Sequence, residues 1–111
     1  MKVAVIGSRT IKIINMEKYL PEDVTEIISG GAKGVDTSAR NYALKNNIKL
    51  AEILPDYDKY GKVAPLKRND IIVDISDLVI AFWDGKSRGT KYVIDYCNKN
   101  HKELRVYICN K

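Results

Sequence analysis

The sequence lacks the residues that many metal and disulfide sites require. It contains one histidine, His101, which excludes a three-histidine metal site. Its two cysteines, Cys97 and Cys109, lie too far apart in the sequence for a CxxC motif. We expect both to be buried or half-buried thiols rather than ligands or nucleophiles. No metal and no other cofactor is predicted.

Long hydrophobic runs are absent as well. No apolar stretch approaches the roughly 18 residues that cross a bilayer. Met1 and Lys2 lead directly into an apolar segment, without the h-region of a signal peptide. We therefore expect a cytoplasmic protein with no membrane partner. The 111 residues, 45% hydrophobic and 30% charged, predict a single domain over 1–111 with a core of its own.

The charge of the chain is not concentrated in any one segment. The formal net charge of +5 favours anionic partners, but the lysines are spread along the sequence. Charge alone therefore does not distinguish a nucleotide ligand, a nucleic acid and simple solubility.

Glycine is scarce over most of the chain but dense at one turn. Three of the seven glycines lie within residues 30–34, between an apolar run that ends at Ile28 and a helical pattern that begins at Val35. A strand that enters a helix through such a turn aims backbone N–H groups and the positive end of the helix dipole at one point, which suits a phosphate. A tight turn without a ligand is the other interpretation. The spacing matches neither a Walker A loop nor the GxGxxG fingerprint.

Strands and helices alternate along the chain. Buried strands are predicted over 2–6, 25–28, 49–54, 77–82 and 104–108, and helices over 15–20, 35–46, 66–75 and 89–100. Residues 56–65 are expected to form a loop, and Ile71, Ile72 and Ile75 the buried face of the helix that follows. This order predicts the α/β class, with a Rossmann-like open parallel sheet of about five strands and helices on both faces.

Polar and small residues gather after the predicted strands. In an open parallel sheet the ligand crevice lies at the carboxyl ends of the strands, so these residues are expected to meet at one edge. We predict a ligand-binding site that contains Gly7, Ser8, Arg9, Gly30, Gly31, Ala32, Lys33, Gly34, Asp36, Arg68, Trp83, Asp84, Gly85, Lys86, Ser87, Arg88, Gly89 and Thr90.

The predicted site has the donors that a phosphate needs. Residues 85–90, like residues 30–34, precede a helix and present backbone N–H groups. Arg9, Arg68 and Arg88 can each bind phosphate oxygens with two parallel hydrogen bonds. Hydroxyl donors are available from Ser8, Ser87 and Thr90.

Other polar and aromatic residues of these loops also have possible roles in a ligand site. Trp83, Tyr57 or Tyr60 can stack on a base, or they can pack against the sheet edge and the loops. Asp84 can accept hydrogen bonds from ribose hydroxyls. Asp36 can face a ligand or can cap the first turn of its helix, and near a phosphate its carboxylate must turn back into the loop.

Five segments, in this order, resemble the motifs of one family: Val5–Thr10, Ile28–Asp36, Tyr60–Lys62, Arg68-Asn69 and Ala81–Thr90. As a set they are similar to the YspA-type branch of the SLOG superfamily. That superfamily also contains the DNA-processing protein DprA, the LOG phosphoribohydrolases and domains that sense nucleotide-derived signals. The resemblance implies a Rossmann-like domain whose pocket takes a nucleotide or a relative of one. It adds Asn69 to the predicted site and implies a homodimer.

One departure from the LOG phosphoribohydrolases concerns catalysis. Their catalytic glutamate lies three residues after a Gly-Gly-x-Gly-Thr motif, and the residue at that distance from Thr90 here is Val93. The arginine that works with the glutamate corresponds to Arg68. Asp84 or Asp36 could supply a carboxylate instead, but no catalytic residue is assigned.

Three functions follow from these observations. The first is the binding of a nucleotide or nucleotide-derived small molecule, such as an ADP-ribose-like ligand, by a sensor, carrier or sequestering module. The second is a nucleotide-processing hydrolase of the phosphoribohydrolase type, which cleaves an N-glycosidic bond. The third is DprA-like binding of single-stranded nucleic acid through Gly7–Arg9 and Ser29–Asp36. It is ranked last, because a chain of 111 residues has little surface beyond the pocket for a long strand.

Overall fold

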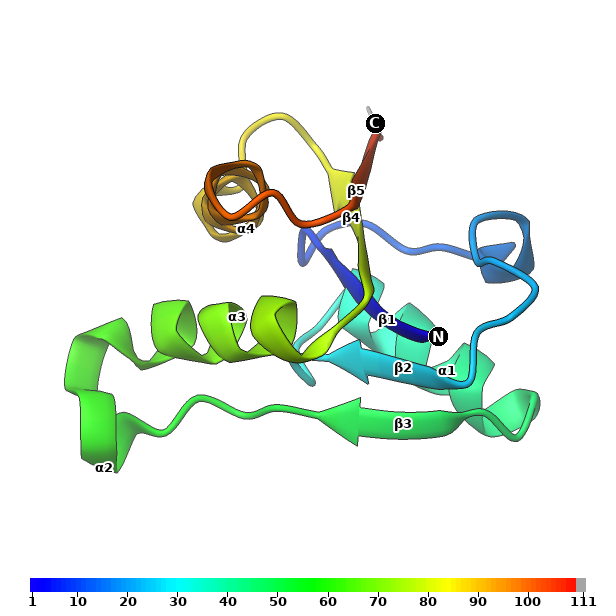
Figure 1. Ribbon diagram of the computed structural model, residues 1–111, viewed down its shortest axis with the longest axis horizontal. Coiled ribbons are helices and arrows are strands. Elements are labelled where there is room, and N and C mark those ends of the chain that lie inside the picture. Colours follow the sequence, from blue (N-terminus) through cyan, green and yellow to red (C-terminus); the bar gives the residue numbers. More distant parts are fainter. Residues whose placement is uncertain (110–111) are drawn as a thin grey trace.

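Five parallel strands form one sheet in the computed structural model, which describes residues 1–109. The strands are β1 (Lys2–Gly7), β2 (Glu26–Ser29), β3 (Lys49–Glu52), β4 (Leu78–Trp83) and β5 (Leu104–Ile108). Their spatial order is β3-β2-β1-β4-β5 (Figure 1), and all four neighbouring pairs are parallel. The structure confirms the predicted Rossmann-like α/β fold class.

The two faces of the sheet are covered by different helices. The helical elements are η1 (Met16–Lys18), α1 (Val35–Lys45), α2 (Tyr57–Tyr60), η2 (Gly61–Val63), α3 (Ala64–Ile75) and α4 (Arg88–Lys99). Val3 and Val5 of β1 point to one face and pack with α1. Their neighbours Ala4 and Ile6 point to the other face and pack with α3 and α4, because successive side chains of a strand alternate between faces. None of the helices described over 1–109 is long and apolar enough to cross a membrane.

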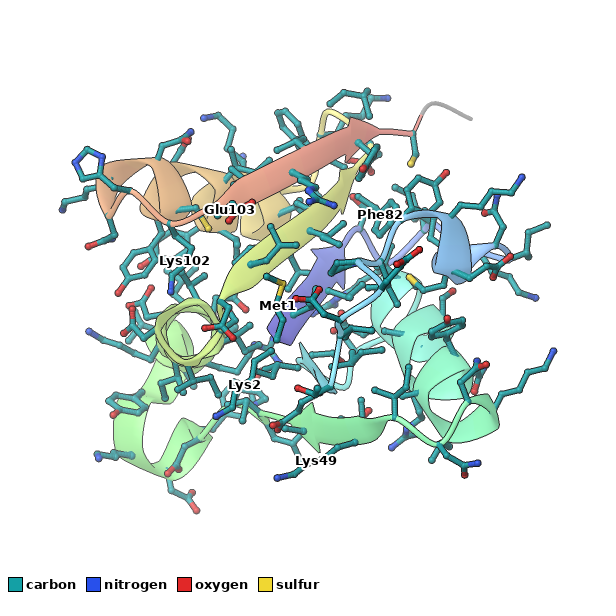
Figure 2. The ribbon with its side chains drawn as sticks, turned by 45° about the vertical axis from the view of Figure 1, so that its right-hand side comes forward. Met1, Lys2, Lys49, Phe82, Lys102 and Glu103 are labelled. Atoms are coloured by element: carbon teal, nitrogen blue, oxygen red, sulfur yellow. The ribbon has the colours of Figure 1, made fainter. Side chains whose placement is uncertain are left out.

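The strand order reverses between β1 and β4. β2 and β3 lie on one side of β1, and β4 and β5 lie on the other. At the carboxyl end of this pair, Gly7 is opposite Phe82, and the Ser8 N–H donates to the Phe82 carbonyl at 3.1 Å. Figure 2 shows Lys2 and Phe82 at opposite ends of the sheet. In such folds the carboxyl end of the switch point is where a ligand crevice forms.

The predicted loop over 56–65 is wrong. This segment contains α2, η2 and the start of α3. Asp56 caps α2, since its Oδ1 accepts the Lys59 N–H at 3.1 Å. Pro65 lies in the first turn of α3, where the missing N–H costs no helical hydrogen bond. Over 15–20 the predicted helix shrinks to one 3-10 turn, Met16–Lys18.

The predicted buried face of α3 is also partly wrong. Ile72 is 1% exposed, but Ile71 and Ile75 are 41% and 42% exposed. The helix is rotated because its other side lies against α4, where Asp70 and Asp74 accept hydrogen bonds from two tyrosine hydroxyls. These are Tyr92 at 2.8 Å and Tyr96 at 2.9 Å. The hydrogen bond to Asp74, with burial adding to it, raises the pKa of Tyr96 to about 12.

The rotation of α3 can be tested with two matched isoleucine-to-alanine substitutions. Ile72→Ala removes a fully buried side chain, so we expect the free energy of unfolding to fall by about 2–5 kcal/mol. Ile71→Ala removes an exposed one and is expected to change it by less than about 1 kcal/mol. Urea denaturation of both variants measures the difference. Equal losses would show that the two side chains are buried alike.

Candidate functional site

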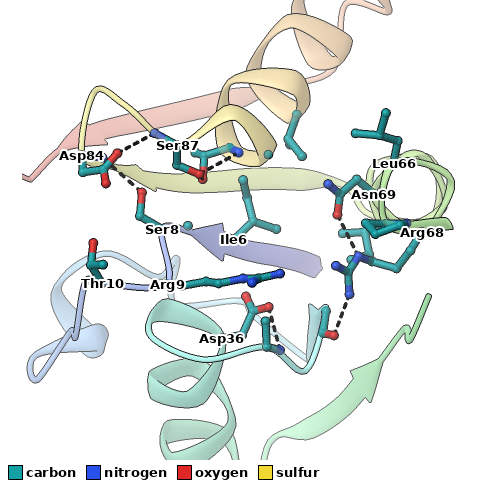
Figure 3. Close-up of a pocket in the computed structure, with 18 residues that line it drawn as sticks. Ile6, Ser8, Arg9, Thr10, Asp36, Leu66, Arg68, Asn69, Asp84 and Ser87 are labelled. Carbon is teal, nitrogen blue, oxygen red and sulfur yellow. Dashed lines mark hydrogen bonds between the residues drawn. The ribbon is translucent and has the colours of Figure 1, made fainter. Parts of the chain in front are cut away.

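A cavity of about 380 Å³ opens at the carboxyl ends of the strands on either side of the switch point (Figure 3). Its walls come from the loops after β1, β2 and β4, from the first turns of α4 and from one face of α3. This volume lies within the range of small-ligand sites, about 300–1,000 Å³. Within residues 1–109 there is no group of three or more metal-ligating side chains.

Twelve of the predicted site residues line this cavity: Gly7, Ser8, Arg9, Gly30, Ala32, Asp36, Arg68, Asn69, Asp84, Ser87, Gly89 and Thr90. The other predicted residues belong to the same loops but do not line it: Gly31, Lys33, Gly34, Trp83, Gly85, Lys86 and Arg88. The convergence of three loops and α3 on one cavity agrees with the expected crevice.

Six lining residues were not predicted: Ile6, Thr10, Pro65, Leu66, Ile72 and Val93. Pro65 and Ile72 follow the helical spacing of Arg68 and Asn69, and they therefore share their face of α3. Val93 lies one turn after Thr90 on α4. The helical period was the signal that could have found these three residues.

The turn over residues 30–34 is shaped by close packing. Gly34 has a φ of 73°, and a Cβ there would lie 2.5 Å from the Arg9 carbonyl oxygen. Two N–H groups of the turn already donate hydrogen bonds within the protein. The Gly31 N–H donates to Ser29 Oγ at 3.3 Å, and the Ala32 N–H donates to Asp36 Oδ2 at 3.1 Å. The turn is therefore only partly available as a backbone cradle for an anion.

Asp36 lines the cavity, and its carboxylate also turns back to the loop that precedes its helix. Its side chain is buried, and it bonds to the Ala32 N–H (Figure 3). Burial raises the pKa of the carboxyl, while the Ala32 N–H and the charge of Arg68 act against that shift. The carboxylate thus holds the turn in place and partly balances a neighbouring guanidinium.

The loop after β4 is folded around Asp84. Its Oδ1 accepts the N–H groups of Lys86 and Ser87, both at 2.8 Å. These two hydrogen bonds lower the pKa of the half-buried Asp84 carboxyl. Trp83 does not reach the cavity, because its Nε1 donates to the Ser87 carbonyl at 3.0 Å and ties the loop down.

The first turn of α4 presents free donors to the cavity. Ser87 caps the helix by accepting the Thr90 N–H at 3.3 Å. The N–H groups of Arg88 and Gly89 precede that of Thr90 in the first turn of the helix, where no intrahelical acceptor exists. Gly89 lines the cavity, and a Cβ there would have no atom within 4 Å. The backbone at this point is therefore open to a ligand.

Two guanidinium groups face the same cavity. Arg9 extends across it toward Arg68 (Figure 3) and makes no hydrogen bond or ion pair with any residue in 1–109. Arg68 is half-buried, and its Nη1 donates to the carbonyls of Gly30 at 2.7 Å and Ile53 at 3.3 Å. Burial lowers the pKa of Arg68, and the charge of Arg9 acts in the same direction. An anion between the two groups would be strongly stabilised.

The buried carboxyl of Asp36 predicts a specific dependence of stability on pH. Its pKa is raised above 3.8 in the folded state, so the stability tied to its neutral form is complete below pH 3.8. That stability is lost as the pH rises through the folded pKa. Relative to Asp36→Asn, the free energy of unfolding of the wild type should therefore fall with rising pH and then level off.

Urea denaturation of both proteins between about pH 3.5 and pH 7 measures this difference. A difference that stays constant, or that grows with pH, would contradict the raised pKa of Asp36.

Comparison with known proteins gives two findings. A family model, "DNA recombination-mediator protein A", matches residues 1–57. A solved structure, the DNA processing protein A (DprA) of Streptococcus pneumoniae, superposes with a TM-score of 0.75 at 23% identity. The match covers 95% of this chain and 49% of that one, so the chain spans about half the length of the protein it matches. No curated protein sequence matches.

Proposed function

Since the chain belongs to the family of DNA recombination-mediator protein A, we propose that it binds single-stranded DNA and holds one nucleotide by its phosphate in the cavity. The family match includes both Gly7–Arg9 and the turn over 30–34, which form two of the cavity walls. Cytoplasmic location and homo-oligomerisation stay predictions from the sequence.

The observation that carries this proposal is the pair of guanidinium groups in one cavity. Arg9 has all its donors free of described partners, and Arg68 is held rigidly by two backbone carbonyls. A phosphate between them would receive charge-assisted hydrogen bonds, which are about twice as strong as neutral ones. The Gly89 N–H and the dipole of α4 add to the same positive field.

The size of the cavity favours a single strand over a duplex. Its volume of about 380 Å³ can take one nucleotide unit but not a base pair with its two backbones. Proteins that bind single strands combine such a positive groove with platforms for unstacked bases. The net charge of +5 supports association with a polyanion.

The carboxylates of the cavity favour binding over hydrolysis. A hydrolase of the N-glycosidic type needs an acid or nucleophile that is free to act on the sugar. Asp84 is occupied by two backbone N–H groups and Asp36 by a third. Both side chains therefore serve to hold the loops, and we assign neither a catalytic role.

Arg9→Ala tests the proposal directly. Loss of a charged hydrogen bond costs about 1.5–3 kcal/mol, so the affinity for oligothymidylate should fall about 10- to 150-fold. The slope of log affinity against log salt concentration should become shallower by about the amount that one phosphate contact contributes. Lys45→Ala, at the far end of α1 from the cavity, is the matched control and should behave as wild type. Fluorescence anisotropy over a range of salt concentrations measures both quantities.

If Arg9→Ala and Lys45→Ala bind oligothymidylate with equal affinity, the phosphate does not bind in the cavity. A wild-type affinity that does not change with salt would contradict binding of a nucleic-acid backbone altogether.

A free nucleotide or nucleotide-derived molecule is the second candidate, and the concave shape of the cavity favours it. It predicts that a nucleoside phosphate such as AMP or ADP-ribose raises the unfolding temperature, because a ligand at a hundred times its dissociation constant adds about 2.7 kcal/mol of stability. A thermal-shift panel measures this. If oligonucleotides bind while no free nucleotide shifts the unfolding temperature, this candidate is excluded.

A further inference from the structure

The connection between β3 and α3 exposes several large apolar side chains. We call residues 54–66 the arm. Within it, Leu54 is 66%, Tyr57 59% and Val63 46% exposed. Figure 1 shows α2 projecting beyond the carboxyl end of the sheet. Contiguous exposed apolar surface often marks an interaction site.

The arm has a defined conformation. Asp56 caps α2 through the Lys59 N–H, and the Tyr60 N–H donates to the Asp56 carbonyl at 3.0 Å. The Nζ of Lys59 lies 5.2 Å from the centroid of the Tyr60 ring. At the end of the arm, Ala64 is fully buried and fixes the start of α3. The exposed side chains are therefore presented by ordered backbone, which lowers the cost of ordering them on binding.

The arm adjoins the cavity described above. Pro65 and Leu66 line the cavity wall, and Leu66 is also 36% exposed, so the two surfaces are continuous. The arm also packs against the helix that carries Arg68, because α2, which contains Tyr57, contacts α3. A ligand that extends out of the cavity past Leu66 would therefore reach the arm.

The chemistry of the arm suits a nucleotide more than an apolar protein surface. Tyr57 offers an exposed aromatic face, and Lys59 and Lys62 are exposed cations that form no ion pair within residues 1–109. Of the two acids on the arm, Asp56 is engaged as the cap of α2, and Asp58 is exposed. Every base has a π face, so stacking on an aromatic ring does not require a particular sequence.

This argument rests on the DNA-binding function proposed above. We infer that the arm is a second nucleotide subsite, in which Tyr57 stacks on the base next to the nucleotide in the cavity and Lys59 and Lys62 attract its phosphate. The cavity then holds one nucleotide by its phosphate, and the arm holds the neighbouring nucleotide by its base.

The test compares thymidine monophosphate with a short oligothymidylate by isothermal titration. Because stacking on an aromatic ring contributes to the affinity for a base, Tyr57→Ala should weaken binding of the oligonucleotide about 5- to 150-fold. Its affinity for the monophosphate should stay at the wild-type value. Tyr57→Phe keeps the ring and should bind both ligands as wild type does. Leu44→Ala removes a side chain of similar exposure, 65%, from α1 and is the matched control.

The outcomes separate the two proposals. If Arg9→Ala weakens binding of the oligonucleotide and Tyr57→Ala does not, the proposal of a second subsite is overturned and the cavity proposal stands. If Tyr57→Ala weakens both ligands equally, Tyr57 acts on the cavity and the second subsite is again overturned. If wild-type protein binds neither ligand, the proposed DNA-binding function itself fails.

Discussion

The pairing of β1 with β4 is the contact on which the rest of this structure depends. Five residue pairs join the two strands in parallel register, from Val3 with Leu78 to Gly7 with Phe82. The pair connects the two halves of the sheet and aligns their carboxyl ends. Because of this alignment, the Asp84 N–H donates to Ser8 Oγ across 76 residues of sequence, at 3.2 Å. A shift of one residue in the register would separate the loops that form the cavity.

Arg68 connects α3 to the loops that follow β2 and β3. Its guanidinium reaches the carbonyls of Gly30 and Ile53, which follow β2 and β3, while its backbone belongs to α3. A half-buried charge of this kind is stable only when its donors are satisfied and an opposite charge is near. Asp36 supplies that charge. The same residues that give the cavity its positive character therefore also hold its walls together.

Much of the fold could be predicted from the sequence, because parallel strands and covering helices leave a strong periodic signal. The strand over 104–108 was predicted with both of its ends correct. The rotation of α3 was not, since three isoleucines at 71, 72 and 75 fit two helical faces equally well. Only the hydrogen bonds of Asp70 and Asp74 to α4 decide between them, and such long-range partners leave no local pattern.

The candidate site was predictable to a similar degree. The polar and small residues near the strand ends, together with Asn69 from the family resemblance, include twelve of the residues that line the cavity. What the sequence did not reveal is how the loops use their own N–H groups. The density of glycine in 30–34 suggested a backbone cradle, but Ser29 and Asp36 already accept two of its hydrogen bonds. Asp84 does the same in the second turn, so the free donors of the cavity come mainly from Arg9 and from the first turn of α4.

This internal use of N–H groups has a consequence for the kinetics of binding. Both loops are held by hydrogen bonds within the protein, so an arriving anion does not have to order them. Immobilising a long side chain costs about 0.5–1.5 kcal/mol, and the free guanidinium of Arg9 is the main group that must lose such motion. A preformed cationic cavity with one mobile side chain captures its ligand at a rate set by long-range electrostatic attraction. The lifetime of the complex then depends on how long the Arg9 contact persists.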